Sequence, residues 1–221
     1  MDSKVLFEDN VNRIKEYLKV YPEDINILSY NDITPLMKAV FYERVDVIDC
    51  LIEHGCDINF QNNDGWTALH YACYNKNNRD IIERLISNGA SGLLKEKWGC
   101  TSLHCAAIDP KDVNIIHQLL VVSDPNALDD CGRSPFMVAC WNKNIDIMSA
   151  LINVTSDINA QDIHGHSPLD YCCIRRDYKG LRFLLSFGAD VSIKDNRGRP
   201  PCNLRDEECK RIINEYLASR N

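Results

Sequence analysis

The stretch Asn63-Asp64-Gly65-Trp66-Thr67-Ala68-Leu69-His70-Tyr71-Ala72 decides the fold, because its pattern returns along the chain at an almost constant interval. The tripeptide Thr67-Ala68-Leu69 at its centre has counterparts at steps of about 33 or 34 residues. The counterparts are Thr34-Pro35-Leu36, Thr101-Ser102-Leu103, Ser134-Pro135-Phe136, Ser167-Pro168-Leu169 and the degenerate Pro200-Pro201-Cys202. A period of this length predicts a solenoid, in which each repeat packs on its neighbours.

Each repeat carries the signals for two short helices. A turn rich in Asn, Asp and Gly precedes the tripeptide, whose Thr or Ser supplies a helix N-cap oxygen and whose Pro suits the first helical position. A second helix follows, with paired apolar residues four positions apart, such as Val47-Ile48 and Leu51-Ile52. This spacing predicts a buried stripe on the second helix.

Glycine placement supports the same register, because a left-handed backbone favours Gly. The turn position holds Gly65, Gly99, Gly132, Gly165 and Gly198, and second helices end at Gly55, Gly89 and Gly188. Asp32 replaces the turn glycine in the first repeat, and Ser123 and Thr155 replace helix-ending glycines. Since a β-branched residue disfavours positive φ, we expect another kind of helix end at Thr155.

The two ends of the chain are amphipathic and predict capping helices. One helical pattern runs from Ser3 to Tyr21 and ends before Pro22, and the other runs from Arg205 to Arg220. The end unit of a solenoid must cover its neighbour and face water on its other side. The third repeat also gains one residue near Pro110.

The residues Asp64-Gly65-Trp66-Thr67-Ala68-Leu69-His70, preceded by Asp57-Ile58-Asn59, resemble the ankyrin repeat, whose pattern is D-x-x-G-x-T-P-L-H-x-A-A with D-V-N. The resemblance implies an all-α fold, an ankyrin repeat solenoid of stacked helix-turn-helix units with projecting β-hairpin-like turns. We expect a single ankyrin repeat domain over residues 1-221 with about five full repeats. Its parts are an N-terminal cap (1-29), repeats at 30-62, 63-96, 97-129, 130-162 and 163-195, and a C-terminal cap (196-221).

Composition restricts the class of partner. The net charge of −7 and the pI near 5.4 do not favour nucleic acid, whose affinity for proteins rests on Lys and Arg. No apolar run approaches the roughly 18 residues of a membrane-spanning helix. The 11 cysteines are odd in number and follow the repeat, which favours free thiols in a reducing compartment. We therefore expect a cytoplasmic or nuclear protein that binds neither nucleic acid nor membrane.

The repeat uses most residues that could carry chemistry. His70 and His104 fall at the repeat's own His position, where the ring would hydrogen-bond the turn of the stack. Ser134 and Ser167 serve as helix N-caps, and no nucleophile comes with an activating base. We therefore expect no enzyme activity and no cofactor.

A metal site built from Cys131, His164 and His166 is the alternative from another function class. These residues lie in successive turns on one edge of the predicted stack. Zinc requires four ligands at about 2.0–2.3 Å, and neighbouring repeats are too far apart to supply them to one ion. We interpret the three side chains as polar turn residues.

Positions that the repeat does not constrain indicate a protein-binding surface. In this family the turn residues beside the Gly and the end of the first helix line the concave face. All three Trp residues fall in this set, and Trp, Tyr and Arg are enriched among interface hot spots. The candidate partner-binding residues are Tyr30, Ile33, Phe41, Tyr42, Trp66, Tyr74, Trp98, Ile108, Arg133, Trp141, Ile163, Ile174, Arg175, Arg197 and Arg199. The alternative is that Trp66 or Trp98 packs flat between adjacent turns and stiffens them.

Charge divides this surface and suggests the chemistry of the partner. Asp64, Asp109 and Asp130 lie in its middle, whereas its arginines gather toward the C-terminal end. A protein partner that offers a helix or extended segment with an apolar centre and an acidic end would match. The alternative is a solvated charged rim.

We therefore expect a monomeric, non-enzymatic protein-protein interaction module that acts as a scaffold, adaptor or inhibitor. Its layout is also similar to that of gankyrin-like assembly chaperones of the proteasome regulatory particle. Its frequent Asn and Ile suit an AT-rich genome, which leaves a pathogen effector or host-interaction protein as a further alternative. Asn59 and Asn159 resemble hydroxylated asparagines of ankyrin repeats, although holding the turn explains their presence better.

Overall fold

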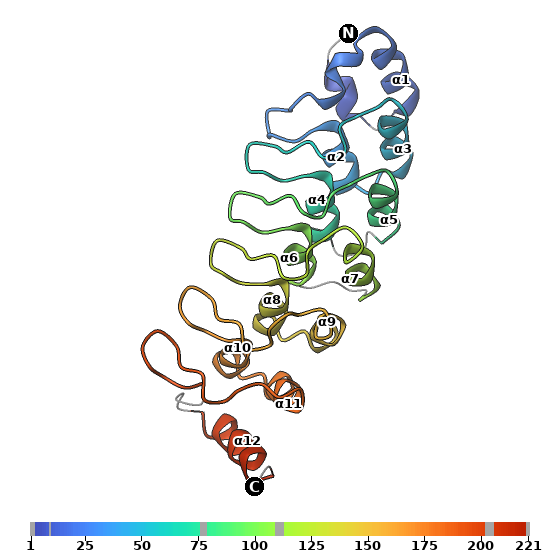
Figure 1. Ribbon diagram of the computed structural model, residues 1–221. Coiled ribbons are helices and arrows are strands. Elements are labelled where there is room, and N and C mark those ends of the chain that lie inside the picture. Colours follow the sequence, from blue (N-terminus) through green and yellow to red (C-terminus); the bar gives the residue numbers. More distant parts are fainter. Residues whose placement is uncertain (1–2, 9, 76–78, 109–112, 202–205, 220–221) are drawn as a thin grey trace. The chain divides into compact units, whose positions relative to one another are not determined.

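Figure 1 shows the protein as a computed structural model, which describes residues 3–8, 10–75, 79–108, 113–201 and 206–219. All regular secondary structure in these ranges is helical, which confirms the expected all-α class. The chain divides into two compact units, of which the first comprises Met1–Cys105 and Pro110–Ser123 and the second comprises Ala106–Asp109 and Asp124–Asn221. The single domain with its repeat boundaries stays a prediction, and the predicted features at Pro110 and Cys202 lie outside the described residues.

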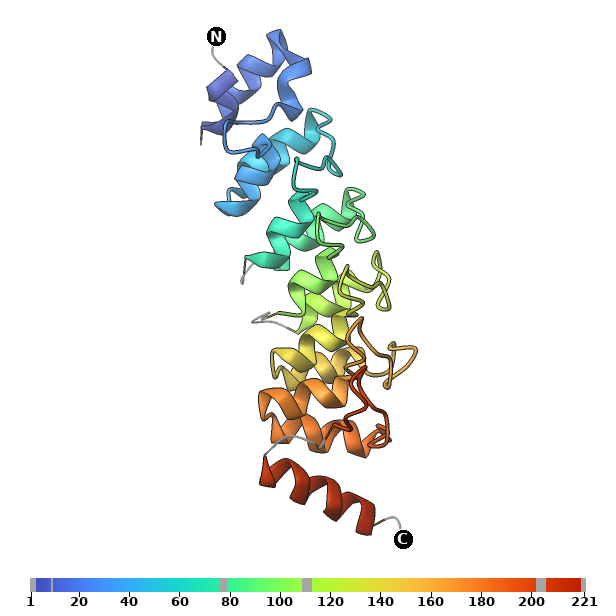
Figure 2. The same ribbon diagram turned by 90° about the vertical axis from the view of Figure 1, so that its left-hand side faces the viewer.

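Helical pairs make up most of each unit. The first unit contains η1 (Ser3–Phe7), α1 (Val11–Val20), η2 (Pro22–Asn26), α2 (Pro35–Phe41), α3 (Val45–Glu53), α4 (Ala68–Tyr74), α5 (Arg79–Ser87) and α7 (Asn114–Leu119). The second unit contains α8 (Pro135–Trp141), α9 (Ile145–Leu151), α10 (Pro168–Arg175), α11 (Tyr178–Ser186) and α12 (Glu207–Ala218), and α6 (Ser102–Ala106) begins in the first unit and ends in the second. Within each unit the first helices of the pairs form one row and the second helices another, and the turns project beyond the first row (Figure 1, Figure 2).

The N-terminal cap differs from the single helical pattern that the sequence predicts between Ser3 and Tyr21. Residues Ser3–Phe7 form a 3-10 helix, and the α-helix begins only at Val11. The side chain of Asn10 caps this helix by accepting a hydrogen bond from the Arg13 backbone N–H at 3.2 Å. The helix ends at Val20, before Pro22, as the sequence predicts.

The first helices begin where the tripeptides predict. Thr34, Thr67, Ser134 and Ser167 each accept a hydrogen bond from the backbone N–H three residues later. The cap satisfies a donor that has no partner inside the helix. A side-chain oxygen at this one position therefore determines where each of these helices starts.

The second helices bury the stripe that their spacing predicts. In α3 the side chains of Val47, Ile48 and Leu51 are at most 3% exposed. In α9 the corresponding Met148 and Leu151 are also buried. Each fully buried side chain of this size contributes roughly 1.5–3 kcal/mol to folding, so the stripe is the main apolar contribution of each repeat.

The turns adopt the backbone that their glycines predict, since all eight predicted glycines have positive φ. Asp32 takes the same conformation at φ 57° in place of the turn glycine. At Thr155 the backbone does not turn left-handed, and the hydroxyl donates instead to the Leu151 carbonyl at 2.9 Å. Glu43, Lys143 and Arg176 also have positive φ, which nothing in their sequence indicated.

Polar side chains join successive repeats within a unit. The amide of Asn59 donates to the Gly89 carbonyl at 3.0 Å and accepts from the Ser91 backbone N–H at 2.8 Å. In the second unit Asn159 accepts from the Asp190 backbone N–H at 2.9 Å. Both asparagines therefore hold turns together, and their hydroxylation stays a prediction.

His70 makes a second link of this kind. Its Nδ1 accepts the Thr67 backbone N–H at 3.2 Å, so Nε2 carries the proton and lies 3.3 Å from the Cys100 carbonyl oxygen. The ring is fully buried, and this burial is the largest cause that lowers the pKa of His70 to about 4. The expected structural role of His70 is confirmed by this geometry.

Acid should therefore destabilise the first unit through His70. Because its pKa is about 4 when folded and about 6.5 otherwise, the unfolded chain binds the proton more readily. The contribution of neutral His70 to the free energy of unfolding is complete above pH 6.5. It decreases by on the order of 3 kcal/mol as the pH falls toward 4. Urea unfolding between pH 7 and 4 should show a shallower pH dependence for His70→Gln than for wild type. Equal slopes would contradict this assignment.

Two glycines with nearly the same φ should differ in how much stability the protein loses when each is replaced by alanine. A Cβ at Gly65 (φ +79°) would lie 2.9 Å from the Glu96 Cα in the next turn, whereas a Cβ at Gly55 (φ +78°) meets no atom within 4 Å. Gly55→Ala should cost about 1 kcal/mol from backbone strain alone. Gly65→Ala should cost about 1–3 kcal/mol more, because backbone must move. Urea midpoints of the two variants measure the difference, and equal midpoints would refute the close packing of the turns.

Candidate binding site

The candidate residues divide between the two units. The first unit holds Tyr30, Ile33, Phe41, Tyr42, Trp66, Tyr74 and Trp98. The second unit holds Ile108, Arg133, Trp141, Ile163, Ile174, Arg175, Arg197 and Arg199. Each group is described within its own unit.

An aromatic cluster covers the first-helix row of the first unit. The Trp66 ring centroid lies 5.0 Å from that of Tyr71 and 5.7 Å from that of Tyr74. Phe41 meets Tyr71 edge-on at 6.4 Å. Trp66 is thus half-buried against aromatic side chains of its own repeat, whereas 58% of Tyr74 remains exposed.

Other aromatic side chains of the first unit are open to solvent. Tyr30 is 97% exposed, Trp98 65% and Tyr42 60%. The Lys97 ammonium lies 5.6 Å from the Trp98 ring centroid and 2.6 Å from an Asp64 carboxylate oxygen. Trp98 therefore lies beside an ion pair at the surface and does not fill the interior of the turn.

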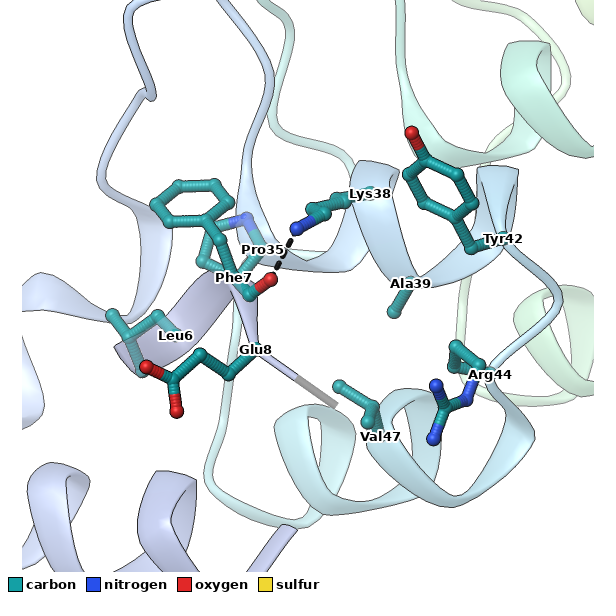
Figure 3. A pocket seen from close by; sticks show the side chains of 9 residues that line it. All are labelled: Leu6, Phe7, Glu8, Pro35, Lys38, Ala39, Tyr42, Arg44 and Val47. Atoms are coloured by element: carbon teal, nitrogen blue, oxygen red, sulfur yellow. Dashed lines mark hydrogen bonds between the residues drawn. The ribbon is translucent and has the colours of Figure 1, made fainter. Parts of the chain in front are cut away.

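A small hollow lies where η1 meets α2 in the first unit (Figure 3). Its lining includes Phe7, Lys38 and Tyr42, and the Lys38 ammonium donates a hydrogen bond to the Phe7 carbonyl. Its volume of about 10 Å³ is at the limit for one water molecule. This hollow joins the N-terminal cap to the first repeat and is too small for a ligand.

The second unit contains a larger hollow, with a volume of about 360 Å³. We call it the α8–α10 groove. It is lined by Cys131, Arg133, Trp141, Asp162, His164, His166, Tyr171 and Ile174. Trp141 and Tyr171 meet edge-on with ring centroids 5.6 Å apart, and 40% of Ile174 is exposed. The groove thus combines an aromatic wall with polar turn residues.

Buried carboxylates shape the turns beside the groove. Asp129, Asp162 and Asp195 occupy the same place in successive turns. One oxygen of each accepts the backbone N–H groups two and four residues later, at 2.8–2.9 Å. This bonding holds the turn closed through backbone groups.

Two arginines of the second unit, Arg133 in the groove and Arg199 outside it, are paired with these carboxylates. Arg133 donates through Nε to Asp129 Oδ2 at 2.7 Å, with Nη2 also at 2.7 Å. Arg199 forms the same bidentate pair with Asp195 at 2.8 and 2.6 Å. The hydrogen bond from Arg199 is the main cause that lowers the pKa of Asp195 to about 2.

The turn between them carries histidine in place of arginine. His166 Nδ1 lies 3.5 Å from Asp162 Oδ2, which also accepts the Tyr171 hydroxyl at 2.6 Å. Burial raises the pKa of Asp162, but the hydrogen bonds from Tyr171 and from the His166 and His164 backbone lower it to below its usual value. Asp162 therefore stays charged and anchors both the turn and Tyr171.

Arg175 at the end of α10 has a different environment. Its guanidinium carbon lies 4.8 Å from the Trp141 ring centroid, and its Nε donates to the Trp141 carbonyl at 3.0 Å. No ion pair joins it to a carboxylate in the described part of the chain. Arg175 is exposed, so its positive charge faces solvent.

The structure brings Arg133, Trp141 and Ile174 into one groove. It adds Tyr171, which the sequence analysis did not single out. Tyr71 and Tyr171 occupy the same place in their repeats, and in the structure each lies against a Trp. Tyr30 and Trp98 line none of the hollows described above.

The described residues also limit the chemistry of the groove. Cys131, His164 and His166 line it together, as their turn positions predict. Within the described ranges, however, no three or more His, Cys, Asp or Glu side chains are placed to hold a metal ion. The helices described here include none long and apolar enough to cross a membrane.

Comparisons with known proteins agree with this architecture. A family model described as ankyrin repeats (3 copies) matches residues 5–96 and 103–195. Among solved structures, the chain is similar to the ankyrin repeat domain of Bcl-3, described as a unique member of the IkappaB protein family. The two chains are 25% identical, the match covers 96% of each, and the TM-score is 0.80.

The anchoring of Tyr171 can be tested by removing its hydroxyl. Tyr171→Phe should destabilise the protein by about 1–3 kcal/mol at pH 7, because a buried charged acceptor loses a donor. The difference should shrink in acid as Asp162 becomes protonated, since the hydroxyl stabilises its charged form. Tyr178→Phe is a matched control that removes a longer bond, 3.1 Å to Asp206, and should cost less. If urea unfolding shows that both variants lose the same unfolding free energy, the Tyr171 hydroxyl does not anchor the helix more strongly than the Tyr178 hydroxyl does.

Proposed function

The chain belongs to the ankyrin repeat family, and from this premise we propose that it is a non-enzymatic protein-protein interaction module. Its contact residues in this proposal are the exposed aromatic and arginine side chains of the turns and first-helix ends. The observation that carries the proposal is the exposure of Trp98, Tyr42 and Tyr74, which are 58–65% open to solvent although no repeat position requires an aromatic residue there.

Covering these side chains with a partner removes their exposed apolar area from water. A fully buried aromatic side chain covers about 150–250 Å², and the 58–65% that is still exposed here corresponds to roughly 2–4 kcal/mol at about 25 cal/mol per Å². Aromatic residues at interfaces therefore supply much of the affinity. The framework of each repeat is already satisfied internally, so these side chains are available for contact without loss of packing.

The proposed partner is a protein that offers a helix or extended segment with an apolar centre and an acidic end. The aromatic cluster of the first unit would receive apolar side chains. The exposed Arg175 and Arg197 of the second unit would receive the acidic end. We further propose that the protein acts as a monomeric scaffold, adaptor or inhibitor in the cytoplasm or nucleus.

The similarity to the Bcl-3 ankyrin repeat domain supports an interaction role, since that domain is described as belonging to the IkappaB family. The gankyrin-like alternative makes a narrower demand, which is direct binding to the C-terminal domain of a proteasomal ATPase. The effector alternative instead demands a partner from a host proteome. Binding measurements with these two classes of partner separate the alternatives.

The proposal can be tested by truncating exposed aromatic side chains. A variant that combines Tyr42→Ala, Tyr74→Ala and Trp98→Ala should keep its fold, because each side chain is more than half exposed. Its capture of partner proteins from native lysate should fall by tenfold or more, since each hot-spot truncation costs ~2 kcal/mol. Quantitative mass spectrometry of the captured proteins measures the loss.

The matched control truncates exposed apolar residues outside the candidate set. Val121 is 79% exposed and Leu93 is 61% exposed. A variant with Val121→Ala and Leu93→Ala should capture the same proteins as wild type. Unchanged capture by the folded aromatic variant would sink the proposal.

A further inference from the structure

We propose that Arg175, held against Trp141, is the residue that determines ligand specificity in the α8–α10 groove. In this inference it binds the carboxylate of an Asp or Glu side chain in a peptide segment. A neighbouring apolar side chain of the same segment enters the groove. The inference rests on the proposed protein-binding function and adds to it one recognition site with a defined chemistry.

Arg175 is oriented before any ligand arrives. Its Nε hydrogen bond to the Trp141 carbonyl at 3.0 Å and its position 4.8 Å from the ring centroid hold the plane of the guanidinium. Nε uses one of the five donors of the group, and the donors on the two Nη atoms remain. A planar pair of Nη donors matches the two oxygens of a carboxylate in a bidentate arrangement.

Arg133, which lines the groove, and Arg199, which holds the equivalent place two turns later, show what Arg175 lacks. Arg133 and Arg199 each form a bidentate pair with a buried Asp of the same turn. An external carboxylate would have to displace those aspartates, which also close the turns through backbone bonds. Arg175 has no such internal partner among the described residues, so its charge is left for a ligand.

The apolar half of the site is adjacent. Trp141 lines the groove and also contacts Arg175, while Ile174 lines the groove and precedes Arg175 in α10. Tyr171 meets Trp141 edge-on and forms part of the same wall. A ligand must therefore present its apolar and acidic side chains close together, which a short peptide segment does.

The charge state of the groove favours a carboxylate over a phosphate. A phosphate carries about −1.5 to −2 charges at neutral pH and gains most from clustered arginines. The aspartates already neutralise Arg133 and Arg199, and Asp162 in the groove lining keeps its negative charge, so the positive charge of Arg175 is the one left for a ligand among the arginines named here. One singly charged carboxylate is the matching ligand.

A phage-displayed library of random twelve-residue peptides tests the inference with the full chain as bait. Wild type should enrich peptides with Asp or Glu within a few positions of Leu, Ile, Phe or Trp. Arg175→Glu should lose this preference for acid and enrich Lys or Arg at the same position. Arg182→Glu on α11 is the matched control, because it makes the same charge change on an exposed residue that does not line the groove.

Synthetic versions of an enriched peptide then give affinities by fluorescence anisotropy. Replacing its acidic residue with Asn or Gln should weaken binding to wild type by about tenfold or more and leave binding to Arg175→Glu unchanged. Arg175→Lys, which keeps the charge without the planar fork, should weaken binding less than Arg175→Glu does. Circular dichroism confirms that each variant is folded.

The possible results distinguish failure of the Arg175 site from failure of the proposed protein-binding function. Acid enrichment that survives in Arg175→Glu, or enriched peptides without acid, would overturn this inference while leaving protein binding intact. Tighter binding of a phosphoserine version by more than tenfold would overturn the choice of carboxylate. If the folded wild type enriches no peptide at all, this inference fails, and the proposed function then depends on the lysate capture alone.

Discussion

The hydrogen bonding that ties each turn to its own first helix and to the next turn is the constraint on which each unit depends. A pair of helices of seven to nine residues, such as α4 and α5, is too short to be stable alone. The pair is stabilised by packing on its neighbours, and the polar links determine the register of that packing. Asn59 and His70 make these links in the first unit through hydrogen bonds to the Gly89 and Cys100 carbonyls.

The same constraint explains why side chains of the turns are available for binding. A buried carboxylate such as Asp162 or Asp195 accepts two backbone N–H groups and closes the turn from inside. Of the residues that supply those N–H groups, Arg199 also pairs with Asp195 through its side chain, and the His166 ring lies 3.5 Å from Asp162. His164 and Arg197, two positions after each aspartate, donate their backbone N–H groups to the turn and are exposed.

The two units present different chemistry on these unconstrained positions. The first unit displays mutually packed aromatic rings, of which Tyr42 and Tyr74 are more than half exposed. The second unit combines an aromatic wall with arginines. The first unit therefore offers mainly apolar contacts, and the second offers charge-assisted hydrogen bonds, which depend more strongly on geometry.

The sequence by itself determined the repeat period, the helix starts, the buried stripes and the left-handed glycines. These features are local, because an N-cap such as Thr67 or a turn glycine such as Gly65 acts on neighbouring residues. Only the tertiary structure decided that Tyr171 belongs to the groove and that Arg175, unlike Arg199, pairs with no carboxylate among the residues that the structure describes. Those facts depend on which side chains of different elements meet in space, and a periodic pattern that treats every repeat alike does not contain them.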